Sequence, residues 1–185
     1  MEIVNKSTEF QTEERPQASW RDYITITKPR IVMSNLITTF VGTWLALHSP
    51  FVDGTMSMFE KFTLAITILL GSALVIAGSC VLNNYIDREF DKQMSRTKNR
   101  PSANGTIKPK TLYQYGIVLF IIGTIVLGFA HPLAALLGLL GVYVYVIVYT
   151  KWLKRSSTLN TVVGGISGAI PPIIGWAGVT GGLEA

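Results

Sequence analysis

The sequence has 185 residues, of which 49% are hydrophobic and only 15% are charged, and it carries a formal net charge of +5. Soluble domains carry about a quarter charged residues, so this composition excludes an ordinary water-soluble fold. It also excludes intrinsic disorder of the whole chain, which requires low hydrophobicity. The single cysteine, Cys80, excludes a disulfide framework and a cysteine-rich metal site.

Four long stretches lack Asp, Glu, Lys and Arg, and they predict the membrane spans. A transmembrane helix needs about 20 mainly apolar residues. The third stretch is long enough for two helices, and His131-Pro132 at its middle predicts a tight turn between them. The predicted fold is all-α, a polytopic transmembrane helical bundle, with spans at about 31–49, 62–84, 112–130, 133–150 and 158–178.

The segment before the first span is polar, and it differs in composition from the rest of the chain. Residues 1–19 include Glu9, Glu13 and Glu14, and they do not have the composition of a secretory signal. We predict a disordered cytoplasmic tail over 1–19 and a membrane domain over 20–185.

The basic residues predict the orientation in the membrane. Every Lys and Arg except Lys61 lies in the amino-terminal segment, in the connection after the second span or in the connection after the fourth. Short loops rich in Lys and Arg stay on the cytoplasmic side, so we predict a cytoplasmic amino end. The net positive charge then reflects topology, and we expect no nucleic-acid partner.

The polar end of the second span carries the most informative residues. Asn83, Asp87 and Asp91 are four residues apart, and no proline or glycine interrupts the helical pattern there. Such spacing places them on one helix face, as a ladder of oxygen ligands. Mg²⁺ prefers hard oxygen ligands and usually takes one or two carboxylates, with phosphates and water completing its shell. The ladder therefore predicts Mg²⁺ and a phosphorylated substrate.

An alternative interpretation gives these acids no function beyond solvating the end of a helix. Arg88 and Lys92 are interleaved with Asp87, Glu89 and Asp91 and could pair with them. Against this alternative, acidic groups at the carboxyl end of a helix oppose its dipole. An amide such as that of Asn83 is also costly near hydrocarbon without a partner.

Cations in two connections are candidates for binding the phosphates. Arg96 and Arg100 follow the ladder closely, and arginine pairs bidentately with phosphate. Lys151 follows the fourth span and is predicted to face the same compartment. The alternative is that these residues only enforce topology or contact anionic lipid headgroups.

The fifth predicted span contains small residues and two prolines. The stretch from Gly164 to Ala169 has small residues at i, i+4 spacing, which favours close helix packing. Pro171 and Pro172 predict a kink or break, and irregular backbone at membrane depth must be covered by protein or line a cavity.

The ladder resembles a motif of the UbiA superfamily of intramembrane prenyltransferases. The first aspartate-rich motif of that superfamily, N-x-x-x-D-x-x-x-D, is matched by Asn83, Asp87 and Asp91. The resemblance covers nearly all of residues 20–185. Three stretches, each weak alone but specific together, narrow it to the branch that farnesylates heme b: Thr27–Arg30, Met94–Pro101 and Gly168–Trp176.

The resemblance implies a membrane bundle around a lipid-accessible cavity with a cytoplasmic mouth. Mg²⁺ would bridge Asn83, Asp87 and Asp91 to the diphosphate of farnesyl diphosphate, and the implied diphosphate ligands are Arg96, Arg100, Lys151 and Lys28. The implied reaction transfers the farnesyl group to a vinyl group of heme b and gives heme O, a precursor of heme A. The implied setting is a bacterial cell membrane, with membrane lipid and the next enzyme of heme A synthesis as candidate partners.

The family pattern also extends beyond this sequence. Its members carry several more spans and a second aspartate motif in a later cytoplasmic loop, so we expect this chain to be the amino-terminal portion of such an enzyme, with little activity alone. Two rival hypotheses remain open. One is a relative that prenylates an aromatic or quinone precursor, and the other is a fragment of a transporter, in which intramembrane polar groups mark an ion path.

Overall fold

The structure is a computed structural model that describes residues 17–52, 54–156 and 158–184. The predicted tail, 1–19, lies outside the described residues except for 17–19, which precede the first helix without regular structure. Within the described residues the secondary structure is entirely helical, as predicted. The helices are α1 (Trp20–Ile26), α2 (Pro29–Leu47), α3 (Met58–Asp91), α4 (Pro109–Ala130), α5 (Pro132–Val142), η1 (Tyr143–Leu153), α6 (Lys154–Ser156) and α7 (Asn160–Thr180).

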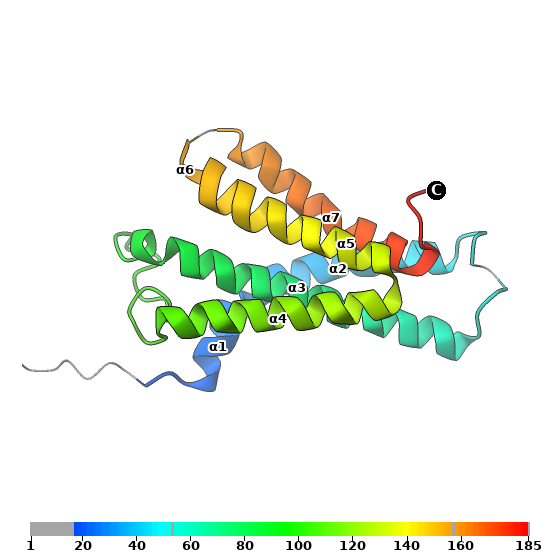
Figure 1. Cartoon of the computed structure of the whole chain (residues 1–185), viewed down its shortest axis with the longest axis horizontal. Coiled ribbons are helices and arrows are strands. Elements are labelled where there is room, and N and C mark those ends of the chain that lie inside the picture. The colour runs from blue at the N-terminus through cyan, green and yellow to red at the C-terminus, as the bar shows by residue number, and fades with distance from the viewer. Residues whose placement is uncertain (1–16, 53, 157, 185) are drawn as a thin grey trace, which may run out of the picture.

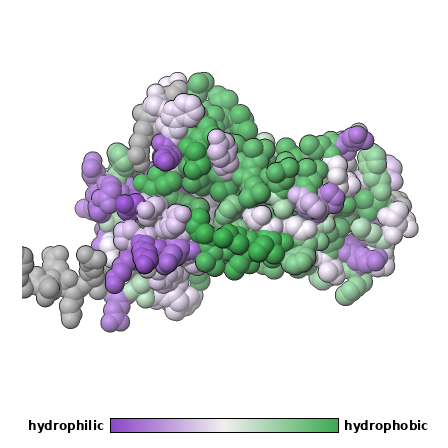
Figure 2. All heavy atoms as spheres, in the orientation of Figure 1, coloured by the Kyte–Doolittle hydropathy of each residue, from purple (hydrophilic) through white to green (hydrophobic). Residues whose placement is uncertain are grey.

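The five predicted spans are confirmed. In the described part of the chain, five helical segments are long and apolar enough to cross a membrane, the fourth being α5 and η1 together. Large apolar side chains such as Phe59 and Phe129 project outward from these segments, and Figure 2 shows an apolar surface over the middle of the bundle. A surface of this kind suits contact with lipid chains.

The spans form a bundle in which α3 packs mainly along α4 and α2 packs mainly along α7. Loop 92–108, α1 and the turn after α6 lie at one end of the bundle, and loop 48–57 and the turn at His131 lie at the other (Figure 1). Hydrophilic residues gather at the first end (Figure 2). The basic connections therefore share one end, while the compartment that this end faces stays a prediction.

The longest helix, α3, continues past its apolar part into the polar ladder, as the sequence predicts. It begins with a capping box, in which Ser57 caps the backbone of Glu60, and it ends at Asp91 after 34 residues. At 1.5 Å per residue this helix is about 50 Å long, well beyond the roughly 30 Å hydrocarbon thickness of a bilayer. Its polar end can therefore stand outside the hydrocarbon.

The fourth span differs from a regular α-helix. It begins as predicted after His131, whose Nδ1 accepts a hydrogen bond from the backbone of Leu133 at 3.1 Å. From Tyr143 to Leu153, however, the backbone winds as a π-helix. Such segments are rare and occur often at functional sites, because the wider turn changes which side chains share a face.

Of the kink or break predicted at Pro171 and Pro172, the break does not occur. Helix α7 runs through both prolines without a break. Close packing against α2 supports this turn: a Cβ atom on Gly42 would lie 2.1 Å from the Pro172 carbonyl oxygen, and one on Gly175 would lie 2.3 Å from that of Thr39. The two backbones touch here, and this contact offsets the hydrogen bonds that the proline nitrogens cannot donate.

The expected close packing at Gly164–Ala169 is also wrong for its central glycines. No described atom outside the local helix lies within 4 Å of a Cβ atom built on Gly165 or Gly168. Gly164, Ser167 and Gly168 instead line a cavity. The small side chains leave space for this cavity, and the close helix contact lies further along α7, at Gly175.

The contact at Gly42 generates a prediction about stability. Gly42→Ala should lower the thermal unfolding midpoint of the detergent-solubilised protein, because the new methyl group meets backbone and overpacking costs about 1–3 kcal/mol. Gly165→Ala is the matched control, since it adds the same methyl group where there is space. Equal unfolding midpoints for the two variants would contradict the α2–α7 contact.

Candidate functional site

The polar end of α3 presents buried acidic side chains on one face. Asn83, Asp87 and Asp91 are 3%, 4% and 6% exposed, respectively. Carboxylates are almost never buried to this extent unless they are paired, because an isolated charge is costly to remove from water. The partners of these groups therefore decide what the site can do.

Both carboxylates pair with cations from other parts of the chain. Lys154 Nζ donates to Asp87 Oδ2 at 2.5 Å, and Arg100 donates to Asp91 Oδ2 at 2.8 Å. Lys154 directly follows the fourth span, as the first residue of α6, and Arg100 lies in loop 92–108. The site thus joins three segments that are far apart in the sequence.

The neighbouring acid, Glu89, behaves differently. Its side chain is 57% exposed and pairs with Arg88 at 3.4 Å and Lys92 at 2.8 Å. The interpretation of the acids as simple solvation of a helix end therefore holds for Glu89. It does not hold for Asp87 and Asp91, which face inward.

A hydrogen-bond network orients the amide of Asn83. Its Nδ2 donates to Asp87 Oδ2 at 3.1 Å and to Thr150 Oγ1 at 3.0 Å, and its Oδ1 accepts from Lys28 Nζ. The sequence-predicted Lys28 therefore reaches the ladder directly. It does so from the N-cap position of α2.

The backbone at Lys28 adopts an unusual conformation. Its φ of 55° lies in the left-handed region, which non-glycine residues rarely adopt and which costs free energy. Burial lowers the pKa of the Lys28 amine, and the nearby cations Arg100 and Lys154 lower it further. Lys28 contacts the Asn83 amide, and Arg100 and Lys154 pair with the two carboxylates, so three basic side chains meet at the ladder in a site suited to an anion.

Loop 92–108 is anchored so that Arg100 is held in place. The buried Thr97 donates its hydroxyl to the Asp91 carbonyl at 3.0 Å, and Ala103 and Asn104 donate their backbone N–H groups to the Arg100 carbonyl. Gly105 in the same loop has a φ of 84°, a conformation that favours glycine.

Two of the predicted diphosphate ligands do not join the cluster. Arg96 and Lys151 are exposed, and neither forms an ion pair with a described residue. Arg100 and Lys28 do join it, and the sequence reasoning missed Lys154 and Thr150. A signal for them was present, since Thr150 and Lys154 are four residues apart and share a helix face, but nothing in the sequence favoured that face over the face of Lys151.

The donor set fits a hard cation that also binds a phosphorylated ligand. Asp87 and Asp91 offer carboxylate oxygens and Asn83 offers an amide oxygen, the ligand types that Mg²⁺ prefers. No group of three or more His, Cys, Asp or Glu side chains that could hold a metal occurs among the described residues. A cation here would therefore need phosphate or water oxygens to complete its coordination, as Mg²⁺ commonly does.

A cavity of about 250 Å³ lies next to the ladder, toward the middle of the bundle. Val75 and Ser79 line it, and they continue the four-residue spacing of Asn83, Asp87 and Asp91 along α3. The same face of one helix therefore carries the cavity and the acidic site, about one turn apart.

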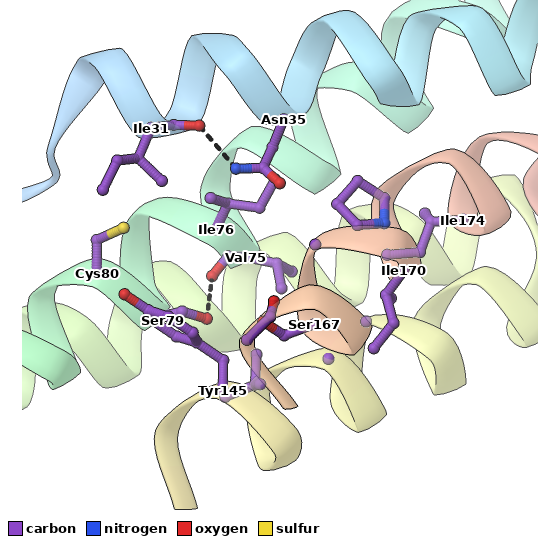
Figure 3. Close-up of a pocket in the computed structure, with 16 residues that line it drawn as sticks. Ile31, Asn35, Val75, Ile76, Ser79, Cys80, Tyr145, Ser167, Ile170 and Ile174 are labelled. Carbon is purple, nitrogen blue, oxygen red and sulfur yellow. Dashed lines mark hydrogen bonds between the residues drawn. The ribbon is translucent and has the colours of Figure 1, made fainter. Parts of the chain in front are cut away.

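The cavity is apolar although several of its lining residues have polar atoms. The side chains of Asn35, Ser79 and Ser167 each donate to a carbonyl of their own helix, at 2.8–2.9 Å. Figure 3 shows the first two of these bonds and places Tyr145 beside Ser79, with Ile170 and Ile174 across the space. Because these polar atoms are satisfied locally, the cavity suits a hydrocarbon group.

The combined geometry is suited to an amphiphile with a highly charged head and an apolar tail. The head would meet three cations and the oxygen ligands of the ladder, and the tail would enter the cavity. Cations fixed around a phosphate can stabilise the negative charge that develops when it leaves.

Comparison with known proteins gives close relatives over much of the chain. It is 45% identical over 182 residues to protoheme IX farnesyltransferase of Alkalihalophilus pseudofirmus, covering 98% of this chain and 57% of that protein. It is 47% identical to protoheme IX farnesyltransferase 2 of Bacillus subtilis, covering 89% and 53%, and 48% identical to protoheme IX farnesyltransferase of Geobacillus thermodenitrificans, covering 92% and 56%.

The chain spans about half the length of the curated relatives it matches. No solved structure is significantly similar to it. The family comparison matches the UbiA prenyltransferase family over residues 35–185, a range that contains the ladder, loop 92–108 and all the cavity-lining residues except Ile31. This match agrees with the membrane bundle and with the spacing of Asn83, Asp87 and Asp91, and the chain therefore belongs to the UbiA prenyltransferase family.

Proposed function

We propose that the protein takes part in the conversion of heme b to heme O, by transfer of the farnesyl group of farnesyl diphosphate to a vinyl group of heme b. The observation that carries this proposal is the continuous face of α3, on which an apolar cavity adjoins two buried carboxylates and their cations. The names of the relatives supply the acceptor, heme b. The activity is proposed for the whole protein, of which this chain would supply one part of the site.

The residues of the ladder would hold the diphosphate through a metal ion. Asn83, Asp87 and Asp91 are the proposed Mg²⁺ ligands, and bound Mg²⁺ would neutralise charge on the leaving diphosphate. Lys154, Arg100 and Lys28 lie where they can bind the remaining phosphate oxygens. Arg96 and Lys151 are exposed near the same end of the bundle and are proposed to act only as the ligand enters.

The proposed task of the cavity is to keep water away from the reactive intermediate. Departure of diphosphate with the electrons of its C–O bond would leave an allylic carbocation. A vinyl group of heme b would attack it, forming a C–C bond and leaving the positive charge on the other vinyl carbon. Water would then add to that carbon and lose a proton, which gives the hydroxyethylfarnesyl group. Water that arrives early would consume the cation. Lining residues whose polar atoms bond to their own helices give such a cation a dry environment.

Two rival hypotheses differ from our proposal, one in the acceptor of the prenyl group and the other in the class of protein. A relative that prenylates an aromatic or quinone precursor would use the same ladder, and only the acceptor separates it from our proposal. A transporter would be expected to place ionisable groups near the middle of a span. Here Asp87 and Asp91 lie at a helix end and pair with cations from loop 92–108 and the fourth span, which favours a phosphate site.

We also propose that the site faces the cytoplasm of a bacterial cell, because almost all Lys and Arg residues lie at its end of the bundle. Farnesyl diphosphate would then arrive from the cytoplasm, and its tail would enter from there or from the lipid. Membrane lipid and the next enzyme of heme A synthesis are the proposed partners.

The acceptor can be tested directly in membranes. This chain is expressed alone or joined to the carboxyl-terminal half of the Bacillus subtilis relative, and the membranes receive heme b, farnesyl diphosphate and Mg²⁺. We expect chromatography to show a more hydrophobic heme with the joined protein and little with the chain alone. Farnesylation of a hydroxybenzoate in place of heme would overturn the proposed acceptor.

The role of the ladder can be tested with two neighbouring acids. Asp87→Asn in the joined protein should lower Mg²⁺-dependent farnesyl transfer at least about 100-fold, because it removes a charged ligand of the leaving-group site. Glu89→Gln changes the same charge on the same helix but affects only the pairs of the exposed Glu89 side chain with Arg88 and Lys92, and it should retain most activity. Equal activity in both variants, at equal amounts of folded protein, would rule out the metal ladder.

The orientation can be tested with single cysteines in a Cys80→Ser background. Ser95→Cys lies in loop 92–108 and Thr55→Cys lies at the opposite end of the bundle, and both positions are exposed. In intact cells we expect a membrane-impermeant maleimide to label Thr55→Cys at once, and Ser95→Cys only after permeabilisation. The reverse pattern would place the site outside the cytoplasm.

A further inference from the structure

Asn84, the neighbour of Asn83 on α3, has a buried amide to which the proposed function gives no role. The residue is 2% exposed. Its Nδ2 donates to the Ile26 carbonyl at 2.7 Å, while its Oδ1 has no hydrogen-bond partner among the described residues. A buried amide with one unpartnered end is costly, and an apolar side chain would avoid this cost. Packing alone therefore does not explain an asparagine at this position.

The Ile26 carbonyl lies where α1 ends and the chain turns toward α2. The last carbonyls of a helix have no partner within the regular helix. The backbone N–H groups of Thr27 and Lys28 bond back to carbonyls of α1, both at 3.1 Å. Asn84 supplies a donor for the carbonyl that follows these two in the chain, that of Ile26. A hydrogen bond from α3 therefore fixes the backbone two residues before Lys28.

Adjacent residues of α3 hold both ends of the short segment from Ile26 to Lys28. Asn84 binds the Ile26 carbonyl, and Asn83 accepts a hydrogen bond from Lys28 Nζ. Neighbouring side chains of a helix point about 100° apart, so the two amides reach different parts of the segment from one rigid backbone.

The conformation of Lys28 requires such a hold. Its φ of 55° is rarely adopted by non-glycine residues. Pro29 follows directly, and a proline favours an extended conformation for the residue before it. The local sequence thus opposes the observed backbone, and a strained conformation persists only where the surrounding structure determines it. The contacts of Asn83 and Asn84 are of this kind, because they bind the segment on both sides of the strained bond.

Apolar contacts hold α1 on the bundle, but they have no direction. Ile26 packs in a buried cluster with side chains of α3, α4 and loop 92–108, and Tyr23 meets Tyr115 edge to face, with ring centroids 5.4 Å apart. Hydrophobic contact is non-directional, whereas a hydrogen bond needs a defined angle. The cluster therefore places α1, and the bond from Asn84 sets the direction in which the chain leaves it.

We propose that Asn84 is a positioning residue, which holds the Ile26 carbonyl so that Lys28 keeps its left-handed conformation and presents its amine at the ladder. This inference rests on the proposed function, because it takes Lys28 to be a ligand of the diphosphate. It assigns Asn84 no contact with the substrate. When a phosphate oxygen replaces Asn83 as the partner of the Lys28 amine, the hold at Ile26 remains in place.

The hold on the turn can be tested without any ligand. Asn84→Leu is close in size and lacks the donor, and hydrogen–deuterium exchange is measured by mass spectrometry on the detergent-solubilised protein. We expect exchange in the peptide that contains Thr27 and Lys28 to become about fivefold faster, since the net value of one hydrogen bond corresponds to about that factor. Exchange around Thr124, in the middle of α4, should not change. Unchanged exchange in the turn would overturn the positioning role and leave the proposed function standing.

A double-mutant cycle tests whether Asn84 acts through Lys28. Binding of inorganic pyrophosphate with Mg²⁺ is measured calorimetrically on the joined protein. Lys28→Met should weaken binding about tenfold, because it removes a charged donor. Asn84→Leu should weaken binding about fivefold alone, but less than about twofold when Lys28→Met is already present, because residues that act through one another are not additive. Equal weakening in both backgrounds, or none in either, would overturn the positioning role. If Asn84→Leu does not purify in folded form, Asn84→Ala lacks the same donor and replaces it in both experiments.

Two further variants separate the remaining outcomes. Gly42→Ala should lower stability at the α2–α7 contact and still bind pyrophosphate like the parent protein, so that a general loss of stability is recognised. Asp87→Asn should lose Mg²⁺-dependent binding. Parent-like binding by Lys28→Met beside loss in Asp87→Asn would overturn the role of Asn84 and leave the metal site standing. Parent-like binding by Asp87→Asn would overturn the metal site and, with it, the inference that rests on it.

Discussion

The burial of two carboxylates at the end of a membrane helix is the constraint on which the arrangement of the polar end depends. Burial of Asp87 and Asp91 beside an apolar bundle is costly without cations, and α3 itself does not supply them, because Arg88 and Lys92 pair with Glu89. The cations come from Lys154 and Arg100. Loop 92–108 and the fourth span must therefore converge on α3 for the acids to be buried.

The cavity lies along the same face of α3, one turn further into the membrane. Small residues of α7 leave the space open at Gly164 and Gly168, and the close contact of α2 with α7 lies beyond it, at Gly42 and Gly175. The close approach of α2 to α7 and the open space of the cavity both occur at residues without large side chains. What differs is whether another backbone comes near, and that depends on the whole bundle.

The difference between local patterns and contacts made across the bundle explains how much of the structure the sequence could predict. The spans follow from charge-free stretches, and the ladder follows from four-residue spacing, because both patterns are local. The choice of Lys154 over Lys151 depends on the π-helical winding of η1, and the continuity of α7 through Pro171 depends on contact with α2. Neither is encoded in a short stretch, and so the sequence did not single out Lys154 and could not exclude a break in the helix.

The charges of the site also fit the proposed ligand. Lys28, Arg100 and Lys154 oppose the two carboxylates, which leaves an excess of positive charge before any ligand binds. A divalent cation bound by Asp87 and Asp91 would release Lys154 and Arg100 from these pairs, so that both could turn to phosphate oxygens. The same cations would thus keep the carboxylates stable in the free protein and hold the diphosphate in the complex. Under the proposed function, a site built this way would favour the metal and the diphosphate together over either alone, because each would compensate charge that the other leaves unpaired.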